Sequence, residues 1–203
     1  MRKIIFFLLF VSPLISFGQD TLMYNVFPIG DGKVNYTKIF TVDSFTKEQL
    51  FVKIKDWAVN SYKSQKATLQ AEDKDAGYIA YKGFLPVIAK YAGGLLKGQS
   101  YAVDIYHTLK FYIKEGKVKI VFTDLEQLSH DFTSSYIANK SGEPIKGTPV
   151  ESWDDEMETV SKKKQEEWKE NITKHARIVH TQVELLLNNI IKEVSKRKSE
   201  FDF

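Results

Sequence analysis

The stretch DIYHTLKFYIKEGKVKIVFTD, residues 104–124, alternates apolar and polar side chains on both sides of Glu115-Gly116. Such alternation predicts two antiparallel strands with one face in the core and one face in solvent. Glu115 and Gly116 are the expected two-residue turn between them. The stretch therefore predicts a long hairpin at the centre of an antiparallel sheet.

This turn fixes which residues face one another across the hairpin, because a two-residue loop leaves only one register. One face then holds apolar pairs that we expect in the core, and the other holds polar and amphipathic pairs that we expect in solvent. The core pairs are Ile113 with Val118, Phe111 with Ile120 and Leu109 with Phe122; the solvated pairs are Tyr112 with Lys119, Lys110 with Val121 and Thr108 with Thr123.

His107 stands on the core-facing side, where the alternation calls for an apolar residue. The register places it opposite Asp124, and a carboxylate can orient an imidazole and raise its basicity. His107 and Asp124 are therefore candidate catalytic residues of a hydrolase, although the hydroxyls of Thr108 and Thr123 point to the other face and supply no nucleophile. The interpretation we favour is a polar couple at the margin of the core, made tolerable by its own hydrogen bond.

The solvated face of the hairpin gathers Tyr106, Lys110, Tyr112 and Lys119. Tyrosine combines apolar area with a hydroxyl and is enriched at protein interfaces. These four are our candidate binding residues for a protein, peptide or glycan partner. An ordinary solvated sheet face would show the same pattern, and both interpretations stay open.

Upstream, residues 33–42 read as a strand, with Gly30-Asp31-Gly32 as a turn ahead of it. Thr46 and Gln49 have the spacing of a capping box, and Phe45 can pack on Leu50 as a hydrophobic staple, so a helix should begin there. The helix should end near residue 62 or 63. Its apolar face comprises Leu50, Phe51, Ile54, Trp57 and Ala58, at helical spacing.

Short strands are expected at 67–71 and 77–84, joined by the acidic turn EDKDAG. That turn lacks the third ligand and the final glutamate of a calcium loop, so we expect a plain hairpin turn. The insertion 85–98 contains Pro86 and three glycines and is not expected to form regular strand. Its apolar character suits a lid, a partner contact or a membrane-surface loop, or else plain packing over the sheet edge.

After Asp131 a connection rich in Gly, Pro and Ser leads to Ser152, the expected N-cap of a helix over 153–198. One helix of that length would be about 69 Å long and must break or overhang the domain. An overhang could support a weak homo-oligomer; otherwise a monomer is expected. The apolar stripe recurs about every 3.7 residues, which favours docking on a sheet over a coiled coil.

Three segments carry a likeness to a known family: FTVDSFTKEQLFVKIKDWA (40–58), GYIAYKG (77–83) and LKFYIKEGKVKIVFTDL (109–125). They resemble a family of domains of unknown function with a TBP-like fold, common in exported proteins of Bacteroidota, over roughly residues 33–130. The resemblance implies an α+β fold, with a curved antiparallel sheet of about five strands and two helices packed on one face. It implies no known activity and supplies no catalytic residues.

The N-terminus has the three parts of a secretory signal peptide: Arg2-Lys3, the apolar run 4–11 and the small residues of Ser16-Phe17-Gly18. We expect cleavage after Gly18, a periplasmic or extracellular location, and no transmembrane segment in the mature chain. Cleavage removes two of the 29 basic residues and leaves 27 against 26 acidic ones. A charge so near zero gives no electrostatic basis for binding nucleic acid.

Chemistry beyond the hairpin is sparse. The chain has no cysteine, so disulfides and thiolate metal sites are excluded. His175 and His180 are five residues apart and lack the spacing of a helical zinc site, so we expect exposed or boundary histidines. The acidic Asp154, Asp155 and Glu156 suit a helix start. We expect no metal, no cofactor and no enzyme, but a single domain over 33–203, after an extension at 19–32, that serves as a binding or structural module.

Overall fold

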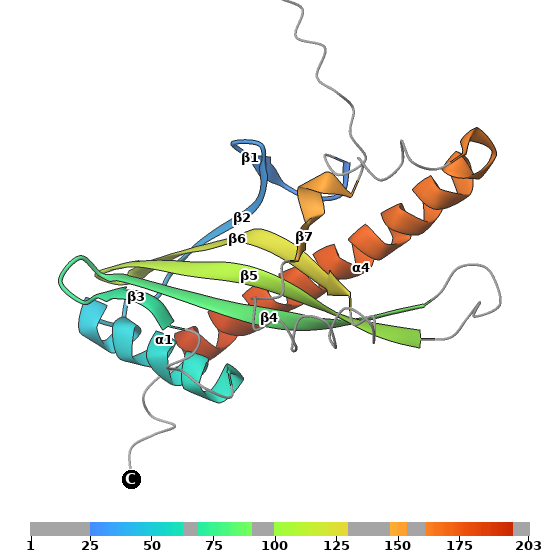
Figure 1. Cartoon of the computed structure of the whole chain (residues 1–203). Coiled ribbons are helices and arrows are strands. Elements are labelled where there is room, and N and C mark those ends of the chain that lie inside the picture. The colour runs from blue at the N-terminus through green and yellow to red at the C-terminus, as the bar shows by residue number, and fades with distance from the viewer. Residues whose placement is uncertain (1–24, 63–68, 91–99, 130–146, 154–160, 197–203) are drawn as a thin grey trace, which may run out of the picture.

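The structure, a computed structural model, describes residues 25–62, 69–90, 100–129, 147–153 and 161–196 (Figure 1). Several predictions concern residues outside these ranges. They are the signal peptide at 1–18, the glycine-rich part of the insertion from 91, most of the connection after residue 131, and the acidic residues at 154–156.

The described residues form one antiparallel sheet with helices on one of its faces, as expected for an α+β fold (Figure 1). Five long strands carry the sheet, and two strands of two residues each extend it beyond the predicted five. The strand order is β1-β2-β6-β5-β4-β3, with β7 beside β6. The strands are β1 (Ile29–Gly30), β2 (Lys33–Thr41), β3 (Leu69–Asp73), β4 (Tyr78–Lys90), β5 (Ser100–Lys114), β6 (Lys117–Ser129) and β7 (Thr148–Pro149).

The central hairpin β5–β6 has the predicted register from its turn as far as Thr108 and Thr123. Gly116 lies in the left-handed region with φ 60°, which a glycine adopts without strain. Its backbone also anchors the turn to the segment after β2. Its carbonyl accepts from the Val42 amide at 2.7 Å and its amide donates to the Phe45 carbonyl at 3.1 Å.

Helix α1 (Lys47–Ser61) begins where the sequence predicted. Thr46 and Gln49 form both bonds of the capping box, so two amides that a helix start leaves without acceptors are satisfied. The helix ends at Ser61, with Tyr62 as C-cap. All five predicted apolar residues, Leu50, Phe51, Ile54, Trp57 and Ala58, are buried.

The C-terminal helix is shorter than predicted. Helix α4 spans Lys162–Ser195 and is about 51 Å long, rather than starting at residue 153. Ser152 is not an N-cap; it belongs to the 3₁₀-helix η2 (Val150–Ser152), and its hydroxyl donates to the Pro149 carbonyl at 2.8 Å. The fully buried stripe of α4 is Ala176, Val179, Val183, Leu187, Ile190 and Val194.

The prediction that the insertion at 85–98 forms no strand is wrong for its first part. Strand β4 continues through Pro86, which pairs with Asp104 of β5. The pairs between β3 and β4 reach only Tyr81, so the later part of β4 has no described neighbour on its other side. A proline is tolerated there because its missing N–H breaks no described ladder bond.

The domain also begins earlier than residue 33. Phe27 is buried against Trp153, with ring centroids 6.2 Å apart, so part of the expected extension belongs to the core. Asp31 and Gly32, both at positive φ, form the predicted turn and join β1 to β2. Such a pair of positive φ values matches the right-handed twist of a tight hairpin.

Candidate functional site

The predicted pairing of His107 with Asp124 is wrong, because a β-bulge intervenes. Thr108 pairs with Thr123, but Tyr106 pairs with Glu126, so two residues of β6 stand opposite His107. Asp124 takes the extra position with φ 54°, a conformation that Asp adopts more readily than most residues. The bulge turns the Asp124 carboxylate away from the helices, and Leu125 enters the core instead.

His107 is instead sealed inside the core, with 2% of its surface exposed. Its ring stacks on Phe122 at a centroid distance of 4.4 Å. Nδ1 lies 3.3 Å from the carbonyl oxygen of Ile105, and Nε2 lies 3.1 Å from the hydroxyl of Tyr62. A carbonyl can only accept, so Nδ1 carries the proton and Nε2 accepts from the tyrosine O–H.

These surroundings fix the charge of His107. Burial lowers the pKa of the imidazole to about 4, against the smaller upward effect of the Ile105 carbonyl. Burial likewise raises the pKa of the Tyr62 hydroxyl, which stays protonated. His107 is therefore neutral at physiological pH, closed to solvent and, among the described residues, not paired with a carboxylate, so a hydrolase built on His107 and Asp124 has no geometric basis.

Tyr62 reaches His107 across β4 because Gly83 leaves room for its ring. Gly83 pairs with His107, and a Cβ placed on it would lie 2.4 Å from Cε1 of Tyr62. No pattern in the sequence indicates this contact, since Tyr62, Gly83 and His107 come from three separate segments.

Asp124 is part of a surface pair. Its Oδ1 lies 3.1 Å from Nζ of Lys33, and both side chains are substantially exposed. Partial burial alone would raise the pKa of Asp124, but the hydrogen bond and charge of Lys33, with a hydrogen bond from Thr108, hold it below its usual value. An exposed pair of this kind contributes little to stability.

The candidate binding residues Tyr106, Lys110, Tyr112 and Lys119 lie together on the helix-free face of the sheet. We call this surface the aromatic face, and the structure adds Tyr78 and Phe84 of β4 to it. Two cross-strand ring pairs join β4 to β5, with centroid distances of 5.2 Å for Tyr78–Tyr112 and 6.3 Å for Phe84–Tyr106. Nζ of Lys119 stands 5.5 Å from the ring centroid of Tyr112. The structure thus brings Tyr106, Tyr112 and Lys119 to one surface as predicted, with Lys110 half-buried between them.

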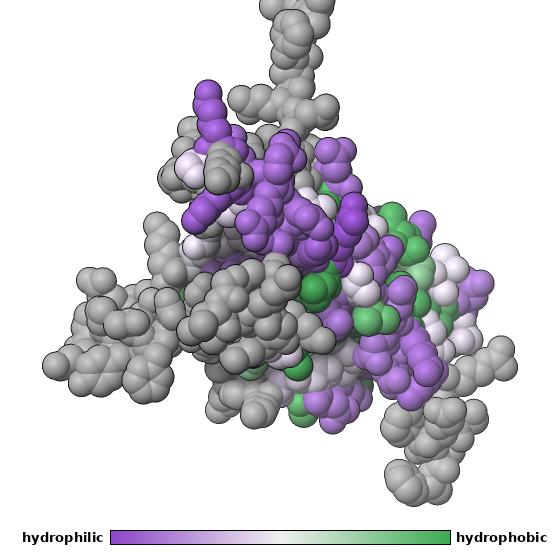
Figure 2. All heavy atoms as spheres, turned by 90° about the vertical axis from the view of Figure 1, so that its right-hand side faces the viewer, coloured by the Kyte–Doolittle hydropathy of each residue, from purple (hydrophilic) through white to green (hydrophobic). Residues whose placement is uncertain are grey.

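The aromatic face exposes more apolar area than the sequence suggested. Phe84 is 50% exposed and Ile88 is 71% exposed on β4, while Ile39 of β2 is 58% exposed beside Lys119. In the side view of Figure 2, apolar residues surface in several small patches between polar ones. Pro86 had argued against strand here, so the outward-facing positions of β4 were not recognised from the sequence.

The two histidines of α4 pack inward against side chains of other elements. Nε2 of His175 lies 2.8 Å from Oε1 of Gln127, and the ring packs on Trp153 at 5.1 Å. Nδ1 of His180 lies 2.8 Å from the hydroxyl of Tyr36. His175 is buried rather than exposed, and burial lowers its pKa.

The acidic turn before β4 is a hairpin turn, as expected. The Asp73 carboxylate accepts from the amide of Ala76 at 2.8 Å, so it closes the turn. Within the described ranges, no three His, Asp or Glu side chains come together in a way that could hold a metal ion.

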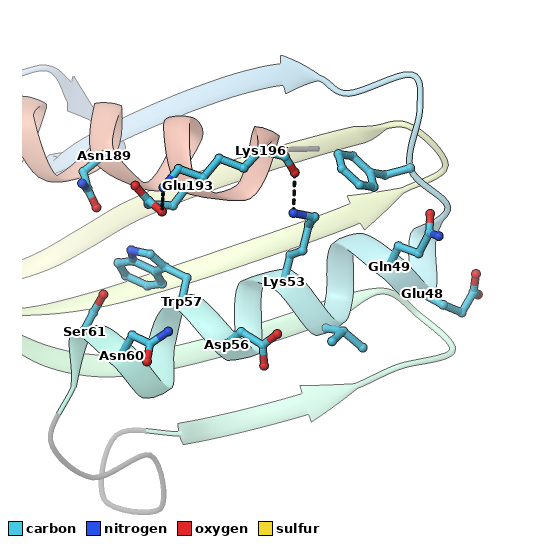
Figure 3. A pocket seen from close by; sticks show the side chains of 12 residues that line it. Glu48, Gln49, Lys53, Asp56, Trp57, Asn60, Ser61, Asn189, Glu193 and Lys196 are labelled. Atoms are coloured by element: carbon cyan, nitrogen blue, oxygen red, sulfur yellow. Dashed lines mark hydrogen bonds and ion pairs between the residues drawn. The ribbon is translucent and has the colours of Figure 1, made fainter. Parts of the chain in front are cut away.

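A further surface feature, not predicted from the sequence, is a groove between α1 and the C-terminal end of α4 (Figure 3). Phe45, Val52 and Trp57 line it, and its volume is about 700 Å³. Val52 could have indicated the groove from the sequence, because it is an apolar residue outside the predicted buried face of α1. In the structure it is 54% exposed.

Comparison with known proteins bears on the fold and not on a ligand. The model of a family described as "Domain of unknown function (DUF4468) with TBP-like fold" matches residues 36–127. A search of the curated proteins finds no match. Neither described helix is long and apolar enough to cross a membrane.

Two solved structures are similar to this chain. A TBP-like protein from Parabacteroides distasonis ATCC 8503 shares 14% identity at a TM-score of 0.52, over 83% of this chain and 97% of that chain. A DUF4468 family protein from Bacteroides ovatus ATCC 8483 shares 15% identity at a TM-score of 0.49, over 79% and 89%. At this identity, the first of these likenesses shows the fold alone.

The family match runs from β2 through α1 to β6 and so covers the hairpin from which the fold was predicted. The resemblance inferred from the sequence over 33–130 is confirmed within it. Residues 36–127 of this chain form a domain of the DUF4468 family, a domain of unknown function with a TBP-like fold.

Proposed function

We propose that this protein is an exported, non-catalytic binding module of the bacterial envelope, and that a partner protein docks on its aromatic face. Export rests on the signal-like residues 1–18. A non-catalytic role agrees with the neutral, sealed state of His107. No activity is assigned to the family that contains this domain.

The observation that carries the proposal is the pair of aromatic contacts on the open side of β4 and β5. Tyr106 and Tyr112 are 41% and 43% exposed, although each packs on a ring of the neighbouring strand. Rings held by neighbours lose little conformational entropy when a partner covers them, which favours binding. Aromatic side chains are also enriched in the cores of protein interfaces.

The chemistry of the face favours a protein over a glycan. Phe84, Ile39 and Ile88 present large apolar surfaces with no hydrogen-bonding group, whereas sugars are covered with hydroxyls that need polar partners. Lys82, Lys110 and Lys119 also point to this side, so the partner should combine apolar side chains with acidic ones.

The test is site-specific photo-crosslinking in a Bacteroidota cell that exports the protein. The photoreactive amino acid p-benzoylphenylalanine replaces Tyr106 on the aromatic face or Val59 on α1 as the matched control. Val59 is 51% exposed on the helix side of the sheet. We expect an adduct with one protein from position 106 and none of that adduct from position 59.

The purified partner is then titrated with the wild type and with charge variants. Lys119→Glu should increase the dissociation constant about tenfold, which is the effect expected of a residue at the centre of an interface. Lys164→Glu, an exposed change on α4, should leave it unchanged. Equal crosslinking from both positions, a glycan adduct, or an adduct with a second copy of this chain would refute docking of a different protein.

A further inference from the structure

The groove between α1 and α4 lies on the opposite side of the sheet from the aromatic face and is independent of the function proposed above. Its volume of about 700 Å³ is typical of sites that hold small molecules. Phe45, Val52 and Trp57 make its walls largely apolar, and α1 and α4 contribute residues from distant parts of the sequence.

Trp57 indicates which chemical group a ligand of this groove should carry. Its side chain is 5% exposed, and its indole nitrogen has no hydrogen-bond partner among the residues that the structure describes. The ring is held by edge contacts with Tyr62 at 5.7 Å and Phe111 at 6.0 Å. In Figure 3 the nitrogen points toward α4, on the side where Asn189 and Glu193 project. A buried N–H donor without an acceptor is rare in native proteins and calls for an explanation.

The charged groups of the groove disfavour an anionic ligand. Nζ of Lys53 donates to the carbonyl of Lys196 and stands 4.7 Å from the ring centroid of Phe45. Nζ of Lys196 lies 2.7 Å from a carboxylate oxygen of Glu193. Glu48 and Asp56 add two further carboxylates, so acids outnumber bases around the groove by one.

We propose that the α1–α4 groove binds a neutral, largely apolar molecule whose carbonyl oxygen accepts a hydrogen bond from the Trp57 indole. The apolar body lies against Phe45 and Val52. The indole nitrogen itself is covered, so the oxygen reaches it after the side chains of Asn189 and Glu193 rotate apart. Asn189 is exposed and Glu193 half-buried, so both have room to move.

The probe is Nile red, a neutral aromatic dye with one ring carbonyl and a fluorescence that increases in apolar surroundings. The chain from Gln19 onward, which includes every described residue, is titrated with the dye. The three tryptophans give three indole N–H resonances in a ¹⁵N spectrum, and Trp57→Phe identifies the resonance of Trp57. We expect saturable binding and a shift of that resonance with dye concentration.

Two variants of exposed valines on α1 provide the matched comparison. Val52→Lys places a charge in the groove and should weaken dye binding at least about tenfold. Val59→Lys makes the same change outside the groove and should leave binding unchanged. Trp57→Phe should weaken binding about three- to tenfold, the worth of one hydrogen bond.

Several results would overturn the proposal. These are an absence of saturable binding, an equal loss in both valine variants, or an unmoved Trp57 resonance while the dye binds. A Trp57 resonance that shifts without dye when the chain ends at Lys196 would assign the groove to the chain's own last residues. A shift with protein concentration alone would assign it to a second copy.

Discussion

The hydroxyl of Tyr62 and Nε2 of His107 meet in the core at 3.1 Å, and this contact links the C-terminal cap of α1 to the centre of β5. It gives the histidine the partner that Asp124 does not provide. The contact also explains how a polar residue is accommodated where the strand pattern calls for an apolar one: both ring nitrogens are satisfied.

Removing the Tyr62 hydroxyl should destabilise the fold. Tyr62→Phe leaves Nε2 of His107 buried without a donor, which costs about 1–3 kcal/mol in the free energy of unfolding. Urea unfolding at pH 7 measures the change. Tyr112→Phe, on the exposed aromatic face, is the control and should change stability little. Equal stability of Tyr62→Phe and wild type would refute the bond.

The stability of the protein should fall in mild acid because of His107. The pKa of its imidazole is about 4 in the fold against an ordinary 6.5, so the unfolded chain takes up the proton first. The contribution of neutral His107 to the free energy of unfolding is complete above about pH 6.5. It is lost as pH falls toward 4, by roughly 3 kcal/mol. His175, whose pKa is also lowered by burial, adds to the loss in the same direction.

Urea unfolding at pH 7 and at pH 4.5 tests this dependence. The variant His107→Met removes the titrating group and should show a smaller difference between the two pH values than wild type, whatever its absolute stability. An identical difference in both proteins would show that His107 is not responsible.

The close approach of Tyr62 to β4 predicts a sensitive glycine. Gly83→Ala places a methyl group 2.4 Å from the Tyr62 ring, and the packed ring cannot move away freely, so the cost should be about 1–3 kcal/mol. Gly30→Ala is the matched control, because its nearest neighbour would be an ordinary 3.5 Å away. Thermal unfolding of both variants compares them, and similar melting temperatures would contradict the close approach.

The bulge at Asp124 predicts an unusual order of substitutions. Asp124→Gly should be tolerated, because glycine adopts a φ of 54° without strain, whereas Asp124→Val should lose about 1–2 kcal/mol more. Both variants lose the exposed contact with Lys33. The difference between their free energies of unfolding in urea therefore reports the cost of the positive φ alone. A valine variant as stable as the glycine variant would argue against the bulge.

Export predicts processing at a defined bond. Expressed in a Bacteroidota host, the full chain should reach the periplasm or the medium with Gln19 as its first residue. Intact mass spectrometry of the protein in the envelope fraction measures the mass of the processed chain and so identifies its N-terminal residue. Recovery of the unprocessed chain in the cytoplasm would exclude the proposed location. Gly18→Leu, which spoils the cleavage site, should leave the chain unprocessed.

Local patterns in the sequence were sufficient for much of the fold. The Thr46–Gln49 capping box and the Glu115-Gly116 turn depend on residues a few positions apart, so they could be read directly. The alternation along β5 and β6 reports which side is buried, because side chains of a strand alternate between faces. The aromatic face was predicted for the same reason.

The candidate site was predictable only where it follows that alternation. The predicted register continues past Thr123 without interruption, but the bulge adds one residue and shifts every later pair. No residue type in the sequence predicts where such a bulge occurs. The 3₁₀-helix η2 likewise replaced the expected helix start, because a capping pattern carries no information on the packing of Val150 against the core.

By itself, the sequence determined the antiparallel hairpin, the two amphipathic helices and the family of the domain, since periodicity and capping act between near neighbours. Only the tertiary structure decided the partner of His107, the room that Gly83 leaves for Tyr62, and the groove at Trp57. Each of these depends on residues from separate segments meeting in space. Their meeting is set by how α1 and α4 pack on the sheet, which no local pattern encodes.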